Sequence, residues 1–432
     1  MSPLLRLLAL ILVVLAAGCG GDDDGEEAAP TETEAAEEAP SFELRIGPVL
    51  PLTGDLASFG PSQAEAARIA VEQIQAALDA QALADVTVRL LAVEDDGGRA
   101  QAGVEAATKF VQTDNVQVLL GTMASSVTIP IAESVTIPNQ VVHITPTSTA
   151  PEITDLADDG YVWRILSTDN LQGSALVDAL ADAFGSDATI NVGARNDAFG
   201  TALKQIFEDG WEEQGGTIGA SVTWNPEAAT FDTEAAQLAG GDPDGWVIID
   251  FPETFAKVGP ALVRAGGWDP ASTFMTEAMR NADELTNIGA QATEGLRGTA
   301  PTSEDAPARD IFDALFEQEA EEGTPLTGFE GASFDAVMLA FLAALHAGSS
   351  EPAELKESLQ TVSGPPGEKY TFEQLGAAIQ ALLDGQDIDY EGAWGPIDFD
   401  ENGDPGSAIY EVWQFDGSEV STLETFRFQG EG

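Results

Sequence analysis

The stretch GTMASSVTIPIAESVTIPNQVVHITPTSTAPEIT, residues 121–154, decides the fold. We predict a strand just before it (116–120), then a turn, a helix that ends near Pro138, a second strand (141–144) and a second turn. Both predicted strands are short apolar runs, which are typical of parallel strands buried on both faces of a sheet. Pro130 is expected in the first turn of the helix, where its missing amide would have no partner in any case.

Small hydroxyl side chains follow both strands. In open α/β sheets this carboxyl edge is where ligands bind. Serine and threonine there can cap the next helix and leave backbone amides free to point at an anion. We therefore interpret the two turns as one half of a small-molecule clamp. The hydroxyl residues are Ser125 and Ser126 after the first strand, and Thr145, Thr147, Ser148 and Thr149 after the second.

Length and charge limit the architecture and the classes of partner. At 432 residues the chain exceeds one ordinary core, so we expect two lobes. Its 17 Lys and Arg against 74 Asp and Glu give a formal charge of −57, which repels nucleic acid and anionic lipid headgroups. Because the acidic residues are scattered over the whole chain, we attribute them to solubility, as in a salty habitat, rather than to an acidic binding function.

The N-terminus has the pattern of a secretory signal, residues 1–19. Arg6 supplies the positive charge and residues 7–17 the apolar core, which is too short to span a bilayer. The segment LAAGC, residues 15–19, resembles the lipobox of bacterial lipoproteins. Cys19 is the single cysteine of the sequence, so it cannot pair within the chain, and we expect it to carry a lipid. The alternative is a plain signal peptide with an incidental cysteine.

Residues 20–41 contain no apolar side chain larger than alanine. Such a segment buries too little surface to offset the entropy of ordering it. We therefore expect a disordered acidic tether that holds the folded part away from the membrane. The expected location is extracytoplasmic, with anchoring to the cell membrane through Cys19 alone.

Strands and helices alternate along the rest of the chain, which predicts parallel sheets with helices on both faces. No long polar linker separates the first series from the second, so we expect lobes joined by crossing strands. The first series has strands 44–50 and 86–92 with helices 61–80 and 101–112; the second has strands 161–166, 189–194, 221–224, 246–250 and 273–276 with helices 170–184, 200–214, 234–238 and 253–265. After them come helices 307–321, 332–347 and 352–361, an added piece 372–383, and a hairpin 394–415 turned at 400–404.

Several short motifs occur in a recognisable order. They are IGPVLPLTG (46–54), ASFG (57–60), EDD (94–96), TPTSTAP (145–151), Asp169 with Gln172-Gly173, DAFG (197–200), FMTE (274–277), and GPI (395–397) with NGD (402–404). Across about residues 44 to 415 the chain resembles the leucine/isoleucine/valine-binding family of extracytoplasmic solute-binding proteins. The motifs are specific jointly, and each alone is weak.

The resemblance implies an α/β fold of two Rossmann-like lobes with parallel sheets joined by three crossovers, the type I periplasmic binding protein fold. It implies a monomer without a cofactor that closes on an amino acid or similar small solute and passes it to the permease of an ABC transporter. The crossovers are expected near 163–167, 298–301 and 394–397. Lobe 1 would then comprise residues 42–164 with 302–393, and lobe 2 residues 165–300 with 394–428.

The resemblance also implies a site. The turns at Ala124–Ser125 and Thr147–Thr149, which include Ser148, would bind a ligand carboxylate through amides and hydroxyls. Asp169 and Glu277 would engage the ligand's ammonium group or the groups next to it. Such a pairing of anion-binding turns with acidic side chains suits a zwitterionic amino acid. Ordinary helix capping is the alternative for Ser125, Thr149 and Asp169.

Three phenylalanines match cleft positions where the family often has aromatic residues with a hydroxyl or an indole. They are Phe59, Phe199 and Phe251. Phenylalanine keeps the apolar wall and removes a hydrogen-bond donor, so the departure affects the identity of the ligand more than the fold. Simple core packing is the alternative for Phe251.

Other functional classes fit less well. Ser125 on a strand-to-helix turn suggests a serine hydrolase, but the sequence around it is not G-x-S-x-G, and His143 lies in an apolar strand as a core histidine would. Asp398, Asp400 and Asn402 start a calcium-loop pattern that lacks its final glutamate, so we expect a turn without metal. We therefore expect no enzyme. A ligand sensor of the same fold that signals to a membrane partner stays open.

Overall fold

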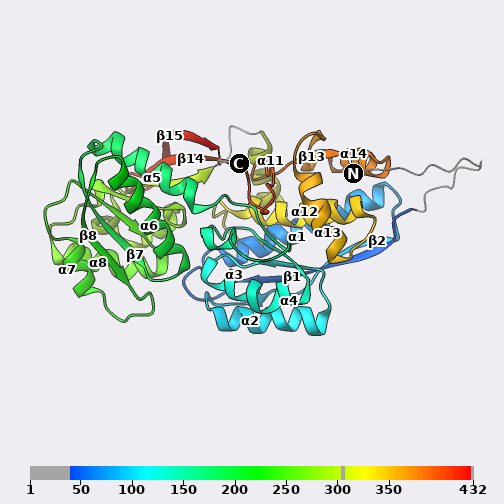
Figure 1. The fold of residues 1–432 in the computed structure, drawn as a ribbon, viewed down its shortest axis with the longest axis horizontal. Coiled ribbons are helices and arrows are strands. Elements are labelled where there is room, and N and C mark those ends of the chain that lie inside the picture. The colour runs from blue at the N-terminus through cyan, green and yellow to red at the C-terminus, as the bar shows by residue number, and fades with distance from the viewer. Residues whose placement is uncertain (1–38, 303–306, 430–432) are drawn as a thin grey trace, which may run out of the picture. The chain divides into compact units, whose positions relative to one another are not determined.

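Two sheets organise the described part of the chain, which comprises residues 39–302 and 307–429 of the computed structural model (Figure 1). Helices pack against both sheets. The predicted signal 1–19 with Cys19, and the tether 20–41 as far as residue 38, lie outside the described residues.

The first sheet is parallel throughout. β4 (Val118–Gly121) and β5 (Val142–Thr145) are buried at every residue, which confirms the prediction of short strands covered on both faces. The strand order is β2-β1-β4-β5-β6, and β3 also pairs with β1. The remaining bounds are β1 Phe42–Leu50, β2 Val86–Leu90, β3 Glu94–Asp95 and β6 Val162–Arg164.

The segment between β4 and β5 differs from the prediction in one respect. It consists of α3 (Ser125–Ile131), a π-helical turn (Ala132–Thr136) and the short α4 (Ile137–Asn139). Placing Pro130 in the first turn was wrong, because α3 begins at Ser125 and so contains Pro130 in its interior. There the proline removes one amide donor from the helix, and the wider π-turn follows.

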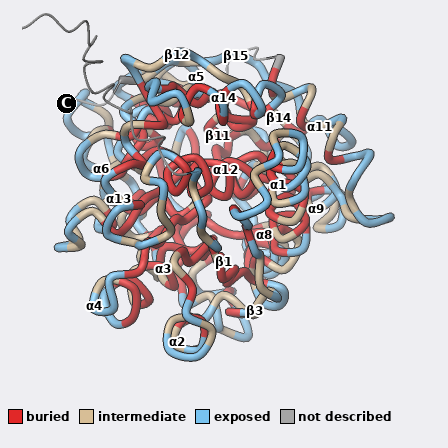
Figure 2. Tube along the Cα trace, turned by 90° about the vertical axis from the view of Figure 1, so that its right-hand side faces the viewer, coloured by how far each residue is buried: buried red, intermediate tan, exposed pale blue. Residues whose placement is uncertain are grey.

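Helix α12 (Glu330–Ala347) lies at the centre of the helices that cover the first sheet. It is buried from Glu330 to Leu345 and packs against α1 (Gly60–Ala80) and α13 (Pro352–Ser363) (Figure 2). Within the described ranges it is the one helix long and apolar enough to cross a membrane, but a helix that is apolar on all sides also suits a protein core, where this one lies. The other elements beside this sheet are α2 Ala100–Lys109, α11 Pro307–Glu319, α14 Leu375–Leu383, and the two-stranded sheet of β12 Glu368–Thr371 and β13 Ile388–Glu391.

The second sheet has the order β15-β14-β11-β10-β9-β7-β8. Strands β7 to β11 pair in parallel, whereas β14 and β15 add an antiparallel edge. Helices α6, α7 and α8 lie around β7 and β8 (Figure 1). The bounds are β7 Thr189–Arg195, β8 Thr217–Trp224, β9 Gly245–Ile249, β10 Thr273–Met275, β11 Arg297–Thr302, β14 Ser407–Phe415, β15 Val420–Gln429, α5 Asp169–Phe184, α6 Ala198–Glu213, α7 Asp232–Leu238, α8 Pro252–Ala265, α9 Ala282–Ile288 and α10 Ala290–Thr293.

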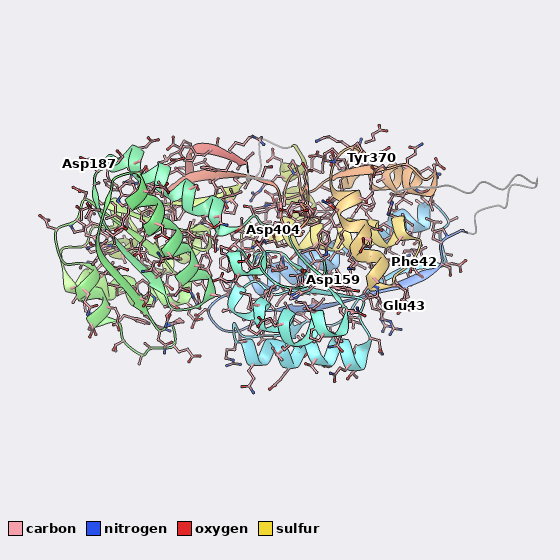
Figure 3. The ribbon with its side chains drawn as sticks, in the orientation of Figure 1. Phe42, Glu43, Asp159, Asp187, Tyr370 and Asp404 are labelled. Atoms are coloured by element: carbon pink, nitrogen blue, oxygen red, sulfur yellow. The ribbon has the colours of Figure 1, made fainter. Side chains whose placement is uncertain are left out.

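The chain passes between the two sheets three times: after β6, after β11 and before β14. This confirms the predicted fold class, and we call the units built on the first and second sheets the first and second lobes. A buried ion pair fastens the first passage to the third, because Arg164 Nε lies 2.5 Å from Asp404 Oδ1 (Asp404 is labelled in Figure 3). Arg164 Nη1 also donates to the carbonyl of Ala150, at 2.9 Å, and so supports the turn after β5.

The C-terminal hairpin also differs from the prediction. Residues 400–404 form only a tight turn, closed by an isolated bridge between Phe399 and Pro405. The long hairpin is β14–β15, turned at residues 416–419. That turn is stabilised by the Asp416 carboxylate, which accepts two backbone amides at 3.0 and 2.9 Å.

Candidate ligand-binding site

The carboxyl ends of neighbouring parallel strands meet at one edge of each sheet. In the first lobe this edge carries the loops after β1, β4 and β5, and in the second lobe those after β7, β9 and β10. Residues from both edges line one pocket, which encloses about 410 Å³ of empty space including its mouth. The lining residues are Leu56, Phe59, Met123, Ala124, Ser125, Thr147, Thr149, Leu166, Phe199, Phe251, Glu277, Ala278 and Phe329.

The pocket brings together eight of the ten residues that the sequence predicts for the site. The first lobe supplies the two turns predicted to hold a carboxylate. The second lobe supplies Glu277, predicted to hold an ammonium group. Ser148 and Asp169 do not line the pocket. The eight that do are Phe59, Ala124, Ser125, Thr147, Thr149, Phe199, Phe251 and Glu277.

Ser125 joins the two turns of the first lobe. Its Oγ accepts the backbone amides of Thr149 and Ala150, each at 3.2 Å. Because the Ser125 oxygen accepts in both bonds, the hydroxyl proton is still free to donate. Capping is not its role, because Ser125 is the first residue of α3 and the cap position, Ala124, has no side-chain cap. The Ser125 hydroxyl is therefore a preset donor on the pocket wall.

Ser148 points away from the pocket into a chain of buried hydroxyls. Its Oγ lies 2.8 Å from Thr128 Oγ1 and donates to the carbonyls of Thr122 (3.1 Å) or Met123 (3.2 Å). Thr147 Oγ1 donates to the same Met123 carbonyl at 3.1 Å. These bonds hold the turn after β4 against the turn after β5. The prediction that Ser148 faces the ligand gives way to a supporting position one layer behind it.

The turn after β4 depends on Gly121. Its φ is +118°, and a Cβ there would lie 2.0 Å from the carbonyl oxygen of Val49, so only glycine fits. The Gly121 carbonyl accepts from His143 Nε2, and His143 Nδ1 lies 3.3 Å from Thr136 Oγ1. Burial lowers the pKa of His143 to about 4, so the ring is neutral. His143 is the core histidine that the sequence predicts.

Asp169 lies behind Thr149 rather than in the pocket. The capping alternative is wrong, because Thr168 caps α5 and Asp169 is its first residue. The Asp169 side chain is fully buried, and its backbone amide donates to the Thr149 carbonyl at 2.9 Å. Burial raises the pKa of Asp169 well above its usual range, and the nearby Glu277 raises it further. Neither carboxylate oxygen has a well-formed hydrogen bond to the described residues, although the Thr149 hydroxyl lies close enough to favour the charged form.

Glu277 presents a carboxylate to the pocket from the second lobe. It follows β10 and is only 7 % exposed. Burial raises the pKa of Glu277, while a hydrogen bond from the Gln172 side chain opposes the rise. A cation placed in the pocket would therefore meet a desolvated acidic group that is held in position.

Aromatic rings form the remaining wall. Phe199 and Phe251 stack with their ring centroids 5.4 Å apart and their planes at 14°. Phe59 meets Phe329 edge to face at 5.8 Å. Phe251 is buried and also lines the pocket, so core packing and a position in the cleft do not exclude each other for this residue.

Sequence reasoning missed five residues of the wall. Phe329 precedes α12, in a segment that no strand-end signal marks. Leu56 lies in the long loop before α1, and Met123 sits within the hydroxyl-rich stretch without a pattern of its own. The pocket-facing apolar residues that the sequence did not single out are Leu56, Met123, Leu166, Ala278 and Phe329.

The alternatives raised by the sequence find little support. Both histidines hydrogen-bond elsewhere, His143 as above and His346 to Ser358 at 2.9 Å, so neither serves Ser125 as a base. Asp400 Oδ1 accepts two backbone amides within its own turn, at 2.8 and 3.0 Å. Across residues 39–302 and 307–429, no group of three His, Cys, Asp or Glu is arranged to hold a metal ion.

Comparison with known proteins gives a consistent result. The model of the family described as periplasmic binding protein matches residues 43–410. The chain is 27% identical to the leucine-, isoleucine-, valine-, threonine-, and alanine-binding protein of Pseudomonas aeruginosa, over 75% of this chain and 84% of that protein. It is 25% identical to the chemotactic signal transduction system substrate-binding protein BasB of Halobacterium salinarum, over 72% of each chain.

The fold has solved counterparts. The crystal structure of a leucine-binding protein from Thermotoga maritima superposes with a TM-score of 0.70 at 21% identity, covering 89% of this chain and 98% of that one. At this identity the likeness concerns the fold. The family match over residues 43–410 shows that the chain belongs to the periplasmic binding protein family, of which leucine-, isoleucine- and valine-binding proteins are similar to it.

Proposed function

We propose that the protein is an extracytoplasmic solute-binding lipoprotein whose lobes close on a small zwitterion, an amino acid with an apolar side chain, and deliver it to an ABC transporter. The observation that carries the proposal is the chemistry of the pocket. Donors on one lobe face a buried carboxylate, Glu277, on the other, with an apolar wall between them. This distribution matches the carboxylate, ammonium and side chain of an amino acid.

The carboxylate end is assigned to the Ser125 and Thr149 hydroxyls. A charge-assisted hydrogen bond to a buried carboxylate contributes about 1.5–3 kcal/mol. The Ser125 proton is free because Oγ already accepts two amides. The ammonium end is assigned to Glu277, a buried carboxyl on the pocket wall whose pKa is raised by burial, so that a cation beside it would favour the charged form.

The side-chain end is assigned to the aromatic wall. Phe59, Phe199, Phe251 and Phe329 offer no hydroxyl or indole donor. A polar ligand side chain buried among them would lose hydrogen bonds to water, at about 1–3 kcal/mol for each unpaired group. We therefore expect aliphatic or aromatic amino acids to be preferred over polar ones.

The proposal also covers the boundaries of the lobes and the attachment to the membrane. We assign residues 42–164 with 302–393 to lobe 1 and residues 165–300 with 394–428 to lobe 2, in accord with the strands that each sheet contains. We expect a monomer, held at the membrane by lipidated Cys19 and presenting its solute to a permease. Sequence features alone support the lipid anchor.

A ligand panel tests the proposal. Amino acids, short amides and aromatic acids are each added to the full chain, and the unfolding temperature is followed. A ligand present at a hundred times its dissociation constant adds about 2.7 kcal/mol of stability. We expect L-leucine, L-isoleucine, L-valine or L-phenylalanine to raise the unfolding temperature, and 4-methylpentanoate, which lacks the ammonium group, to do so much less. A panel in which no amino acid stabilises the protein would refute the proposal.

Sensing is the second candidate function. The likeness to BasB over 72% of the chain favours it, since that protein is named for chemotactic signal transduction. The two functions differ in their downstream partner. Deleting the protein should abolish uptake of radiolabelled ligand if it serves transport, and should abolish the behavioural response but leave uptake intact if it serves sensing.

A further inference from the structure

One ion pair joins the two lobes beside the pocket. Asp55 lies in the loop between β1 and α1, and Arg195 ends β7. Arg195 Nη2 is 3.1 Å from Asp55 Oδ2, and Thr254 Oγ1 on α8 donates to the same oxygen at 3.2 Å. A single carboxylate of the first lobe therefore contacts two elements of the second.

Arg195 is held in place by its own lobe. It pairs with Asp197, which also caps α6 by accepting the amide of Gly200 at 3.0 Å. Its Nη1 lies 3.6 Å from the fully buried Asp250. Asp197 and Asp250 belong to the same lobe as Arg195, whereas Asp55 belongs to the other lobe. Asp55 is therefore the partner whose contact depends on how the two lobes meet.

The ion pair contacts both halves of the pocket wall without lining the pocket. The Arg195 guanidinium carbon lies 3.7 Å from the ring centroid of Phe251, which stacks on Phe199. On the other side, Asp55 directly precedes Leu56 of the wall. The contact thus links the loop after β1 to the aromatic wall of the second lobe.

The same pair lies at a rim between two spaces. Asp55 lines a second cleft of about 590 Å³, together with Ser58 of its own loop and Pro252 and Glu253 of α8. The Asp55 side chain is 26 % exposed and that of Arg195 6 %. The ion pair therefore stands between the ligand pocket and an outer cleft.

We propose that Asp55 and Arg195 form a closure latch that positions both halves of the pocket wall and slows release of the bound solute. The inference rests on the proposed function, since a latch needs a solute to retain. Both are positioning residues, because they act through Leu56 and Phe251. An ion pair that forms only when the lobes meet affects release more than capture.

The variant Asp55→Asn tests the latch in the full chain. It keeps the shape of the side chain and removes its charge. We expect the dissociation rate of L-isoleucine to rise about tenfold and its association rate to stay within about twofold, measured by stopped-flow. We expect the unfolding temperature without ligand to fall only slightly, because the pair is a single, partly exposed contact. A purely structural role for Asp55 would lower the unfolding temperature and leave both rate constants unchanged.

A matched control removes an ion pair that joins no lobes. Asp232 pairs with Arg264 at 2.6 Å within the second lobe, and both side chains are exposed. Asp232→Asn should leave the release rate unchanged. If the wild type binds L-isoleucine and Asp55→Asn releases it no faster than Asp232→Asn does, the latch is wrong.

A second measurement separates the latch from the proposed function. Small-angle scattering of the ligand-free proteins compares the radius of gyration, which needs no ligand. We expect Asp55→Asn to be more expanded than the wild type, and Asp232→Asn to match the wild type. If the wild type binds no amino acid, the proposed function fails and scattering alone decides: equal radii for all three proteins would refute the latch.

Discussion

The Ser125 hydroxyl stabilises the fold and, in the proposed function, also donates to the ligand. Its oxygen accepts the amides of Thr149 and Ala150, which sets the turn after β5, and its proton is left to donate into the pocket. Asp169 and Arg164 support the same turn through its carbonyls, at 2.9 Å each. The turn is thus fixed before a ligand enters, and a preorganised site loses less entropy on binding.

Ser125→Ala should weaken binding without unfolding the protein. The substitution removes the donor and leaves two amides without their acceptor, so we expect the affinity for L-isoleucine to fall about 10- to 100-fold, which corresponds to about 1.4–2.8 kcal/mol. Isothermal titration calorimetry measures it. The control is Ser126→Ala, because Ser126 is the adjacent serine and does not line the pocket. Equal affinities of the two variants would remove Ser125 from the site.

Asp169 predicts a pH dependence of stability. Its folded-state pKa is raised by burial and by Glu277, so the native protein keeps this proton at pH values where the unfolded chain has lost it. Stability from this group is therefore present below the ordinary aspartate pKa of about 4 and is lost as the pH rises through the folded-state pKa.

Asp169→Asn should remove the loss of stability that Asp169 causes as the pH rises, because asparagine does not ionise. We expect the variant to match the wild type near pH 4 and to be more stable than the wild type near pH 8, in urea unfolding at both pH values. A variant that is less stable than the wild type at pH 8 would mean that the charged carboxylate is stabilising, as pairing with Arg164 would make it.

At the scale of elements, the sequence predicts most of the strands, because buried parallel strands leave short apolar runs. β4 and β5 follow from such runs to within two residues. The strand predicted at 161–166 to start the second series is instead β6 of the first sheet. The position of Pro130 and the hairpin were not predictable in the same way. The first residue of a helix depends on the geometry of the turn after the preceding strand, which the sequence pattern does not show. Residues 400–404 and 416–419 both contain residues typical of turns, but only the second segment joins two paired strands.

The site was predictable as far as it follows from strand ends. Residues after β4, β5 and β10 reach the pocket because parallel strands end at one edge. Which of several consecutive residues faces inward depends on backbone dihedrals, so Ser148 could not be told from Thr147 or Thr149. Phe329 could not be found, since its place in the pocket depends on how α12 packs.

Helix α12 also fastens the third passage between the lobes. Asp335 is fully buried and accepts from the amides of Ala393 (2.9 Å) and Trp394 (2.7 Å) and from the hydroxyl of Tyr390 (2.8 Å). A Cβ on Gly392 would lie 2.3 Å from the same carboxylate, so the segment approaches α12 closely.

Asp335→Ala should therefore be strongly destabilising. It leaves three buried donors unpaired, each at about 1–3 kcal/mol, so we expect a loss of at least about 3 kcal/mol in urea unfolding. The control is Asp209→Ala on the exposed face of α6, which should change stability by no more than about 0.5 kcal/mol. A loss for Asp335→Ala as small as that of the control would show that the passage is held by other contacts.

For the whole molecule, the charge of −57 dominates the electrostatics. Like charges over the surface destabilise the compact state by mutual repulsion, and salt screens them over about 10 Å at 0.1 M and about 3 Å at 1 M. We expect the urea midpoint to rise between 0.1 and 1 M KCl at pH 7. The rise should shrink at pH 4.5, where many carboxylates are protonated. A midpoint that falls with KCl at pH 7 would indicate that attractive ion pairs outweigh the repulsion.

The position of a bound amino acid tests the central claim most directly. A crystal structure of the protein grown with L-isoleucine measures it. We predict the carboxylate within hydrogen-bond distance of Ser125 Oγ and the Thr149 hydroxyl, the ammonium group on Glu277, and the side chain against Phe199 and Phe251. Density for the ligand elsewhere, or in this pocket with its ends reversed, would contradict the account.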